Sequence, residues 1–214
     1  KDEVIVQTCH RMGYDRAIRA VGVHHVEVTT PAELEAAYSD RTAMAFLFGD
    51  ASERGQIPVK EMAASARARG VPSLVDAAAE RPDVPNWYLA QGVDVVAYSG
   101  GKCLRGPQAS GLVLGRKDLL QAALLNGCPH GAIGRPMEVA KEEIMGLLAA
   151  VEQWIARDHQ AEWREWERRL QVITTVNQIQ NIYWDLVNAY ENVKVQEESL
   201  HLADKTLGDN KKQV

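Results

Sequence analysis

The chain has 214 residues, of which 46% are hydrophobic and 25% are charged, and its formal net charge is −5. These proportions exclude a wholly disordered chain and a disulfide-dense mini-protein, and the acidic balance argues against binding DNA through a basic surface. The longest apolar runs, such as 43–48, are far shorter than the roughly 20 residues of a membrane-spanning helix. The N-terminus does not resemble a secretory leader, so we expect a cytoplasmic protein.

Residues 4–116 alternate short β-rich runs with helical stretches. We expect strands at 4–6, 26–28, 43–48, 73–76, 93–99 and 111–114. We expect helices at 14–21, from Pro31 with Thr30 as N-cap, and from Pro58 to about Arg69, with Gly22 and Gly70 as stops. This alternation predicts an α/β fold with a mainly parallel sheet and flanking helices. Ligands bind beyond the carboxyl ends of the strands in such sheets, here just after residues 7, 48, 76 and 99.

From Lys117 onward the pattern is mostly helical. Every arginine lies at or before Arg169, and this change in composition suggests a junction near residues 170–173. We therefore divide the chain into a partial α/β large domain at 1–136, a linker of one or two helices at 137–171, and a long C-terminal helix at 172–214. Heptad spacing in that helix indicates a coiled-coil seam that pairs with other helices. The seam consists of Val172, Val176, Ile179, Tyr183, Leu186, Tyr190, Val193, Leu200 and Leu207.

Two expected strand ends carry charged residues that are unusual beside buried strands. Asp76 ends the run Leu74-Val75-Asp76, and Lys102 follows Ser99-Gly100-Gly101 after the next strand. Buried Asp and Lys are normally paired or functional. The alternative is that Asp76 caps a helix and Lys102 is a surface lysine. On spacing alone the two interpretations have equal weight.

Pyridoxal phosphate would explain this pair. The cofactor needs a lysine amine for a Schiff base and a carboxylate beside its pyridine nitrogen. Lys102 and Asp76 supply these groups. Gly100 and Gly101 would let the backbone approach a ligand closely, and Ser99 could donate to a phosphate.

The run from Ser99 to Gly111, SGGKCLRGPQASG, resembles the lysine segment of selenocysteine synthase-like enzymes. The flanking runs 75–80, 133–137 and 141–144 agree. These enzymes are fold-type I pyridoxal-phosphate proteins, and their relatives include ammonia-lyases of sugar amino acids. The resemblance covers about residues 1–171. It implies a lyase or transferase that removes the α-proton of an amino acid or amino-sugar acid, with Lys102 as base, and then eliminates or replaces a β-group.

The resemblance extends to further residues. It implies that His10, just beyond the first strand, stacks on the cofactor ring, and that Arg105 and Arg135 bind a substrate carboxylate or phosphate. For each of these three residues a solvated side chain without a role is an equal alternative. The three cysteines lack CxxC spacing, so we expect no metal site.

The resemblance also implies a homo-oligomer. Binding of tRNA is doubtful because Gly101 stands where selenocysteine synthase usually has Asp, and the tRNA-binding region is absent. The phosphate-binding turn of the family would precede Lys1, so we expect the chain as given to be inactive.

Residues 173–214, with Tyr183-Trp184-Asp185-Leu186, resemble a periplasmic helix of TolC-type outer-membrane efflux proteins. That resemblance makes the chain a chimera. Two alternatives to an enzyme fragment therefore remain. One is an efflux-channel component, and the other is a non-catalytic α/β module that self-associates.

Overall fold

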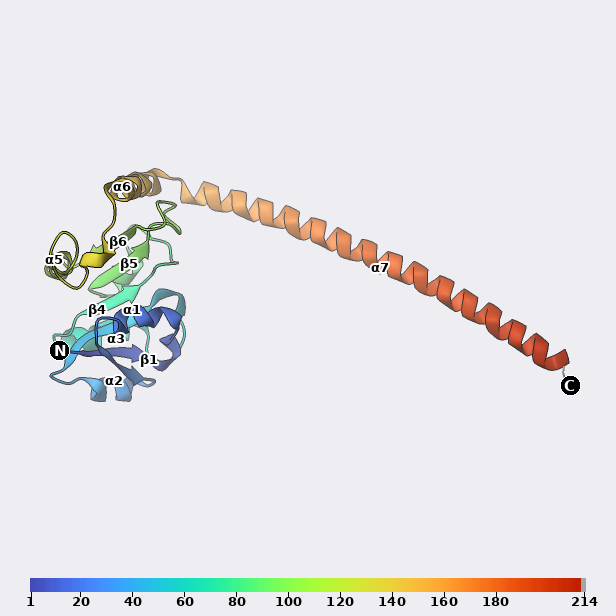
Figure 1. Ribbon diagram of the computed structural model, residues 1–214, viewed down its shortest axis with the longest axis horizontal. Helices are drawn as coiled ribbons and strands as arrows, with labels where there is room; N and C mark the ends of the chain where they lie inside the picture. Colours follow the sequence, from blue (N-terminus) through green and yellow to red (C-terminus); the bar gives the residue numbers. More distant parts are fainter. Residues whose placement is uncertain (213–214) are drawn as a thin grey trace. The chain divides into compact units, whose positions relative to one another are not determined.

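The computed structural model describes residues 1–212 and divides the chain into two compact units (Figure 1). The first unit is Lys1–Arg157, and the second begins at Asp158. This boundary precedes the junction expected near residues 170–173. Each unit is described by itself below.

The first unit is built on one six-stranded sheet. Its strands are β1 (Glu3–Gln7), β2 (His24–Val28), β3 (Thr42–Phe48), β4 (Ser73–Asp76), β5 (Val95–Ser99) and β6 (Gly111–Gly115). Their spatial order is β2-β1-β3-β4-β5-β6. Every neighbouring pair is parallel except β5 and β6, which pair antiparallel through registers such as Ser99 with Gly111. All six expected strands and the mainly parallel α/β fold are confirmed.

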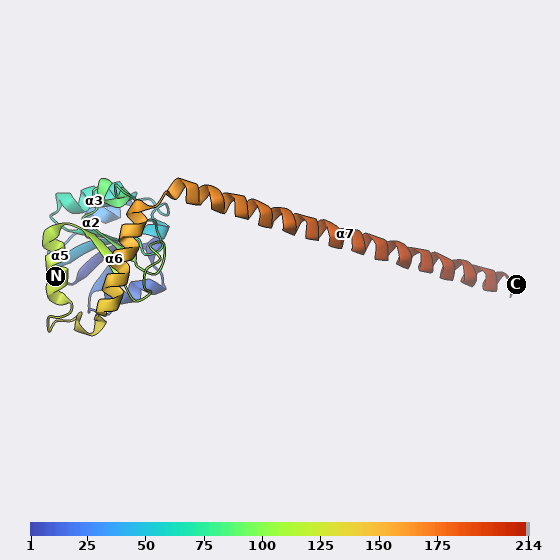
Figure 2. The same cartoon turned by 90° about the horizontal axis from the view of Figure 1, so that it is seen from above.

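Helices and short 3₁₀ turns connect these strands (Figures 1 and 2). The helices are α1 (Arg16–Arg19), α2 (Pro31–Ala37), α3 (Val59–Ala68), α4 (Trp87–Ala90), α5 (Lys117–Asn126) and α6 (Lys141–Ala156), and the 3₁₀ turns are Thr8–His10, Gly13–Asp15, Gly49–Ala51 and Arg135–Met137. Thr30 caps α2 as expected, because its Oγ1 accepts from Glu33 N at 3.2 Å. The helix expected at 14–21 is shorter, because Asp15 binds Arg11 and does not cap α1.

The alternating side chains of the strands form two apolar clusters. The larger cluster includes Ile5, Leu47 and Val96 from the strands, together with Met62 of α3 and Trp154 of α6. Trp154 Nε1 donates to Pro82 O at 2.9 Å, which satisfies the buried indole nitrogen. The smaller cluster consists of Val4, Val6, Phe46, Phe48 and Ala51. Both clusters converge on the central strands, so the core fixes the strand ends after β3, β4 and β5.

The second unit is the helix α7 (His159–Lys212). It begins where Asp158 Oδ1 accepts from Ala161 N at 2.9 Å, and it continues without interruption through residues 170–173. The expected linker at 137–171 is therefore divided between α6 and the start of α7. No helix in the described part of the chain is both long and apolar enough to cross a membrane.

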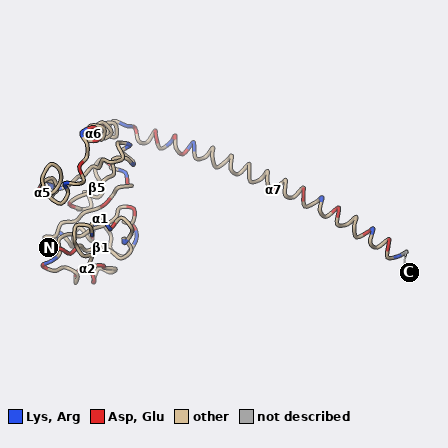
Figure 3. Tube along the Cα trace, viewed as in Figure 1, with Lys and Arg blue, Asp and Glu red and all other residues tan. Residues whose placement is uncertain are grey.

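The heptad seam of α7 is exposed to solvent along its length. Tyr183, Leu186 and Tyr190 have 57%, 67% and 61% of their surfaces accessible. Residues 170–184 carry no charge, and Figure 3 shows this uncharged stretch between charged segments of the helix. Pairing of this helix with another helix remains a prediction.

Candidate functional site

Asp76 and the Ser99–Lys102 segment lie at neighbouring strand ends, as the sequence predicts. β4 and β5 are paired, with Asp76 opposite Ala97. The chain stays beside β5 after β4 ends, because Ala77 N donates to Ala97 O at 2.8 Å. Asp76 Oδ1 accepts from Ala78 N at 3.0 Å. This bond fixes the half-buried carboxylate at the edge of the sheet.

A recess with a cavity volume of about 90 Å³ lies at this edge. Its lining residues are Met12, Tyr14, Phe48, Asp50, Asp76, Ala78, Ala79 and Lys102. The recess thus combines one ammonium, two carboxylates, two aromatic side chains and three smaller apolar side chains. This volume is below the roughly 300–1,000 Å³ typical of small-molecule sites, so only part of a cofactor-sized molecule would be enclosed here. Asp76 and Lys102 therefore line one recess, but Lys102 is exposed and Asp76 also accepts from Ala78 N, as the alternative expects, so their functional roles stay a prediction.

Gly100 and Gly101 are constrained by their own chain. A Cβ on Gly100 would lie 2.0 Å from Ser110 Oγ, and one on Gly101 would lie 2.5 Å from Gln108 Oε1. The loop folds back further, because Gly106 N donates to Gly100 O at 2.7 Å. Residues 106–110 therefore pack so closely against Gly100 and Gly101 that a side chain would not fit at either position. The sequence-based explanation, a closely bound ligand, is not needed to account for them.

The other predicted residues are distributed around the site. Ser99 is half-buried at the end of β5 and is not in the lining of the recess. Arg105 has a positive φ of 61° in the turn that closes when its N–H donates to Lys102 O at 2.9 Å. Arg135 lies in the loop after α5, where it forms an ion pair with Glu138 and donates to Cys128 Sγ at 3.4 Å. Neither arginine lines the recess.

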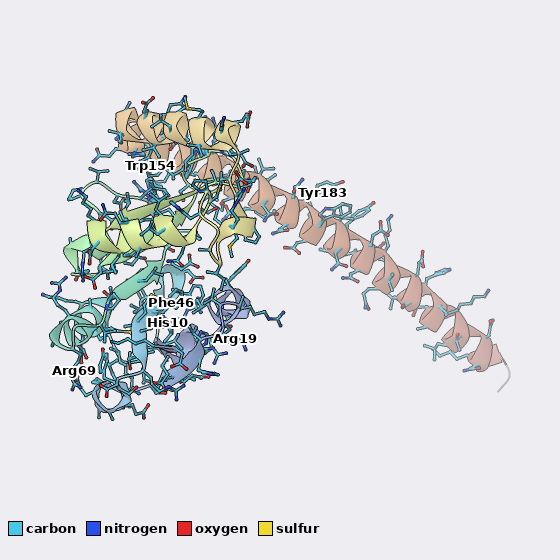
Figure 4. The ribbon with its side chains drawn as sticks, turned by 60° about the vertical axis from the view of Figure 1, so that its left-hand side comes forward. His10, Arg19, Phe46, Arg69, Trp154 and Tyr183 are labelled. Carbon is cyan, nitrogen blue, oxygen red and sulfur yellow. The ribbon has the colours of Figure 1, made fainter. Side chains whose placement is uncertain are left out.

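His10 lies in the interior of the first unit (Figure 4). Its side chain is fully buried, and Nδ1 accepts from Phe48 N at 3.2 Å. Burial lowers the pKa of His10, although the backbone of Arg54 and Ala51 acts in the opposite direction. His10 is not among the residues that line the recess, so its predicted stacking role stays a prediction.

Six lining residues were not selected from the sequence as site residues: Met12, Tyr14, Phe48, Asp50, Ala78 and Ala79. The rule that ligands bind just after strand ends does indicate the region after residue 48. Met12 and Tyr14 give no such signal, because they enter the recess through the 3₁₀ turn after β1. Within residues 1–212 no group of three or more His, Cys, Asp or Glu side chains is arranged to hold a metal ion.

The strand order and the site at the carboxyl ends of parallel strands are consistent with one family. The family model for aminotransferase class-V matches residues 4–131, which is more than half of the chain. The chain belongs to the aminotransferase class-V family.

Individual relatives have different activities. The chain is 36% identical over 168 residues to 5'-C-glycyluridine monooxygenase-decarboxylase from a Streptomyces species, covering 72% of this chain and 41% of that protein. It is 32% identical over 198 residues to D-glucosaminate-6-phosphate ammonia lyase from Salmonella typhimurium. That match covers 86% of this chain and 51% of the lyase. It is also 37% identical over 82 residues to L-seryl-tRNA(Sec) selenium transferase from Desulfovibrio desulfuricans. That match covers 33% of this chain and 17% of the transferase. The chain spans about half or less of each of these proteins.

A solved structure gives the same result. The structure of D-glucosaminate-6-phosphate ammonia-lyase superposes with a TM-score of 0.66 at 31% identity, covering 73% of this chain and 44% of that one. Both comparisons support the resemblance of the N-terminal part to selenocysteine synthase-like enzymes and ammonia-lyases.

These findings do not support the chimera or the efflux-protein resemblance of residues 173–214. Residues 1–171 make up only about four-fifths of the chain, so a match covering 86% of it extends beyond residue 171. α7 also begins at His159, well before the expected junction. The resemblance to an efflux helix stays an untested prediction.

Proposed function

We propose that this chain is the cofactor-binding part of a pyridoxal-phosphate-dependent lyase or transferase that acts on an amino acid or amino-sugar acid. The observation that carries this proposal is the presence of Lys102 and Asp76 in the lining of one recess. A lysine amine and a carboxylate are the two groups that this cofactor requires from a protein. The relatives in the ammonia-lyase and selenium-transferase groups support the substrate class.

The residues of the recess fit the ring of the cofactor. Asp76 uses Oδ1 for Ala78 N, so Oδ2 is available to a protonated pyridine nitrogen. Ala78 and Ala79 offer small side chains beside a flat ring, and Lys102 lines the same space. For the phosphate the fit is weaker, because Lys102 is the only cation in the lining. We therefore expect binding without efficient turnover in this chain alone.

In this proposal the protein moves protons and holds charge. When bound, the cofactor withdraws electrons from the carbon that loses a proton. The Lys102 amine would take that proton, since Lys102 lines the same recess as Asp76. The Asp76 carboxylate would face the ring nitrogen and favour its protonated form. Loss of a β-group or its replacement would complete the reaction.

Titration of the 214-residue chain with pyridoxal phosphate tests the proposal. We expect a new visible absorbance band, and borohydride reduction followed by peptide mass spectrometry should locate the cofactor on Lys102. Lys102→Ala should lose both signals. Lys117→Ala is the matched control, because Lys117 starts α5 and does not line the recess. The proposal fails if the wild-type chain gives no band, or if the label is spread over several surface lysines.

A further inference from the structure

An ion-pair network centred on the buried Asp15 carboxylate includes residues on either side of Met12 and Tyr14 in the chain. Arg11 Nε donates to Asp15 Oδ2 at 2.5 Å, and Arg11 Nη1 pairs with Glu27 on β2. Arg19 Nη2 lies 3.3 Å from Asp15 Oδ1. The Asp15 side chain is only 3% exposed. Both of its carboxylate oxygens therefore face a guanidinium group.

This network spans the two residues that enter the recess. Met12 and Tyr14 lie between Arg11 and Asp15 in the chain, and both line the recess with Asp76 and Lys102. Met12 also packs against the smaller apolar cluster, whereas Tyr14 is held mainly by the turn that the Asp15 N to Met12 O bond of 3.1 Å closes. A Cβ on Gly13 would meet nothing within 4 Å, and Tyr14 is 77% exposed. Packing alone does not fix Tyr14 in place.

We propose that Asp15 is a positioning residue for the recess. Its ion pair with Arg11 closes the loop 11–15 and holds Met12 and Tyr14 as part of the recess wall. A buried carboxylate between two arginines suits this role, since bidentate and charge-assisted contacts fix geometry better than neutral ones do. The inference rests on the proposed function, because it assigns the wall to the cofactor's binding site.

The pair Asp2–Arg41, whose members directly precede β1 and β3, provides a matched control. Arg41 donates to Asp2 Oδ1 at 3.0 Å and to Oδ2 at 2.8 Å. Both partners are exposed, and neither lines the recess. Asp2→Asn therefore removes an Arg–Asp pair without touching the wall.

The test measures cofactor affinity and local order separately. Asp15→Asn should weaken binding of pyridoxal phosphate about tenfold or more, as loss of a supporting residue commonly does at other ligand sites. It should also speed hydrogen exchange in residues 8–15, whereas Asp2→Asn changes neither quantity. Arg11→Gln, at a partly exposed position, should reproduce the effect if Asp15→Asn does not fold. If Asp15 acts through Tyr14, Asp15→Asn should add little to Tyr14→Ala.

The outcomes separate the two proposals. A wild-type chain that gives no absorbance band overturns the proposed function, and with it the assignment of the wall to the cofactor. The role of Asp15 is overturned, and the proposed function is kept, if the wild type gives a band and both folded variants, Asp15→Asn and Arg11→Gln, bind pyridoxal phosphate within twofold of the wild-type affinity. Additive effects of Asp15→Asn and Tyr14→Ala would also overturn it, because they would show that Asp15 acts by another route.

Discussion

Asp76 and Lys102 line the same recess although they belong to different strand–loop connections. Parallel pairing of β4 and β5 is the reason, because it brings both carboxyl ends to one edge of the sheet. The Asp76 carboxylate is then fixed by Ala78 N, and Lys102 is placed by the loop that folds back onto Gly100 and Gly101.

Asp76→Asn should weaken binding of pyridoxal phosphate about 10- to 100-fold. The substitution removes a charge-assisted hydrogen bond worth about 1.5–3 kcal/mol to the pyridine nitrogen. Spectroscopic titration measures the change. Asp40→Asn, at an exposed position outside the recess, should leave the affinity unchanged. Equal affinities for Asp76→Asn and the wild type would remove Asp76 from the site.

Gly101→Ala should destabilise the fold by about 1–3 kcal/mol, the usual cost of overpacking. The added Cβ would lie 2.5 Å from Gln108 Oε1 and 2.7 Å from Gln108 Cα, so the backbone must shift as well as the side chain. Urea unfolding measures the loss. Gly131→Ala is the control, since its Cβ would meet nothing within 4 Å. A difference below about 0.5 kcal/mol between these variants would show that the loop adapts freely.

Asp94→Ala should reduce the free energy of unfolding by about 3 kcal/mol, because it leaves the backbone N–H and the hydroxyl of the buried Ser73 without their acceptor. Asp94 Oδ2 accepts from Ser73 N at 2.9 Å and from Ser73 Oγ at 3.0 Å, and Oδ1 accepts from Arg116 at 3.2 Å. Asp118→Ala removes only the exposed ion-pair partner of Arg116. It should reduce the free energy of unfolding by less than about 1 kcal/mol. Similar losses for the two variants in chemical unfolding would contradict this assignment.

His25 should make the protein less stable in mild acid. Burial lowers its pKa below the ordinary 6.5, and Arg11 and Arg19 lower it further, while Asp15 and Glu27 act against this. The unfolded chain then binds the proton more tightly than the folded protein does. Stability is therefore fully present above about pH 6.5 and falls as the pH drops toward the folded value, by at most about 1.4 kcal/mol per pH unit.

The variant His25→Leu tests this dependence. Neither ring nitrogen of His25 has a hydrogen-bond partner, so leucine removes the titration without removing a hydrogen bond. Urea unfolding between about pH 7.5 and pH 5 should give a flatter profile for His25→Leu than for the wild type. His24, the neighbouring exposed histidine, supplies the control. His24→Leu should keep the wild-type dependence of stability on pH. Parallel profiles for all three proteins would exclude His25 as the source.

Leu186→Lys in α7 should weaken any self-association of the chain at least tenfold. A buried leucine contributes about 1.5–3 kcal/mol, and Leu186 lies on the heptad seam with 67% of its surface exposed. Asn188→Lys adds the same charge outside the seam and should have little effect. Sedimentation equilibrium compares the three proteins. A wild-type chain that stays monomeric at high concentration would contradict the predicted pairing of this helix.

Local sequence patterns determined much of the fold. Alternation of β-rich runs and helices predicted all six strands, and Thr30 and Gly70 marked helix ends correctly. These features depend on residues close together in the chain. The same holds for placing Asp76 and Lys102 at strand ends, since strand pairing follows from the α/β pattern.

The tertiary structure decided which side chains reach the recess. His10 lies just beyond a strand end, yet the core encloses it beside Phe48. Tyr14, four residues later, lines the recess. That difference arises from the direction of the turn after β1, which the pattern of strands and helices does not specify. Gly100 and Gly101 likewise owe their identity to Ser110 and Gln108, which come back across the loop. Sequence spacing fixes where a strand ends, but the direction of the side chains beyond it depends on contacts made only after the chain has folded.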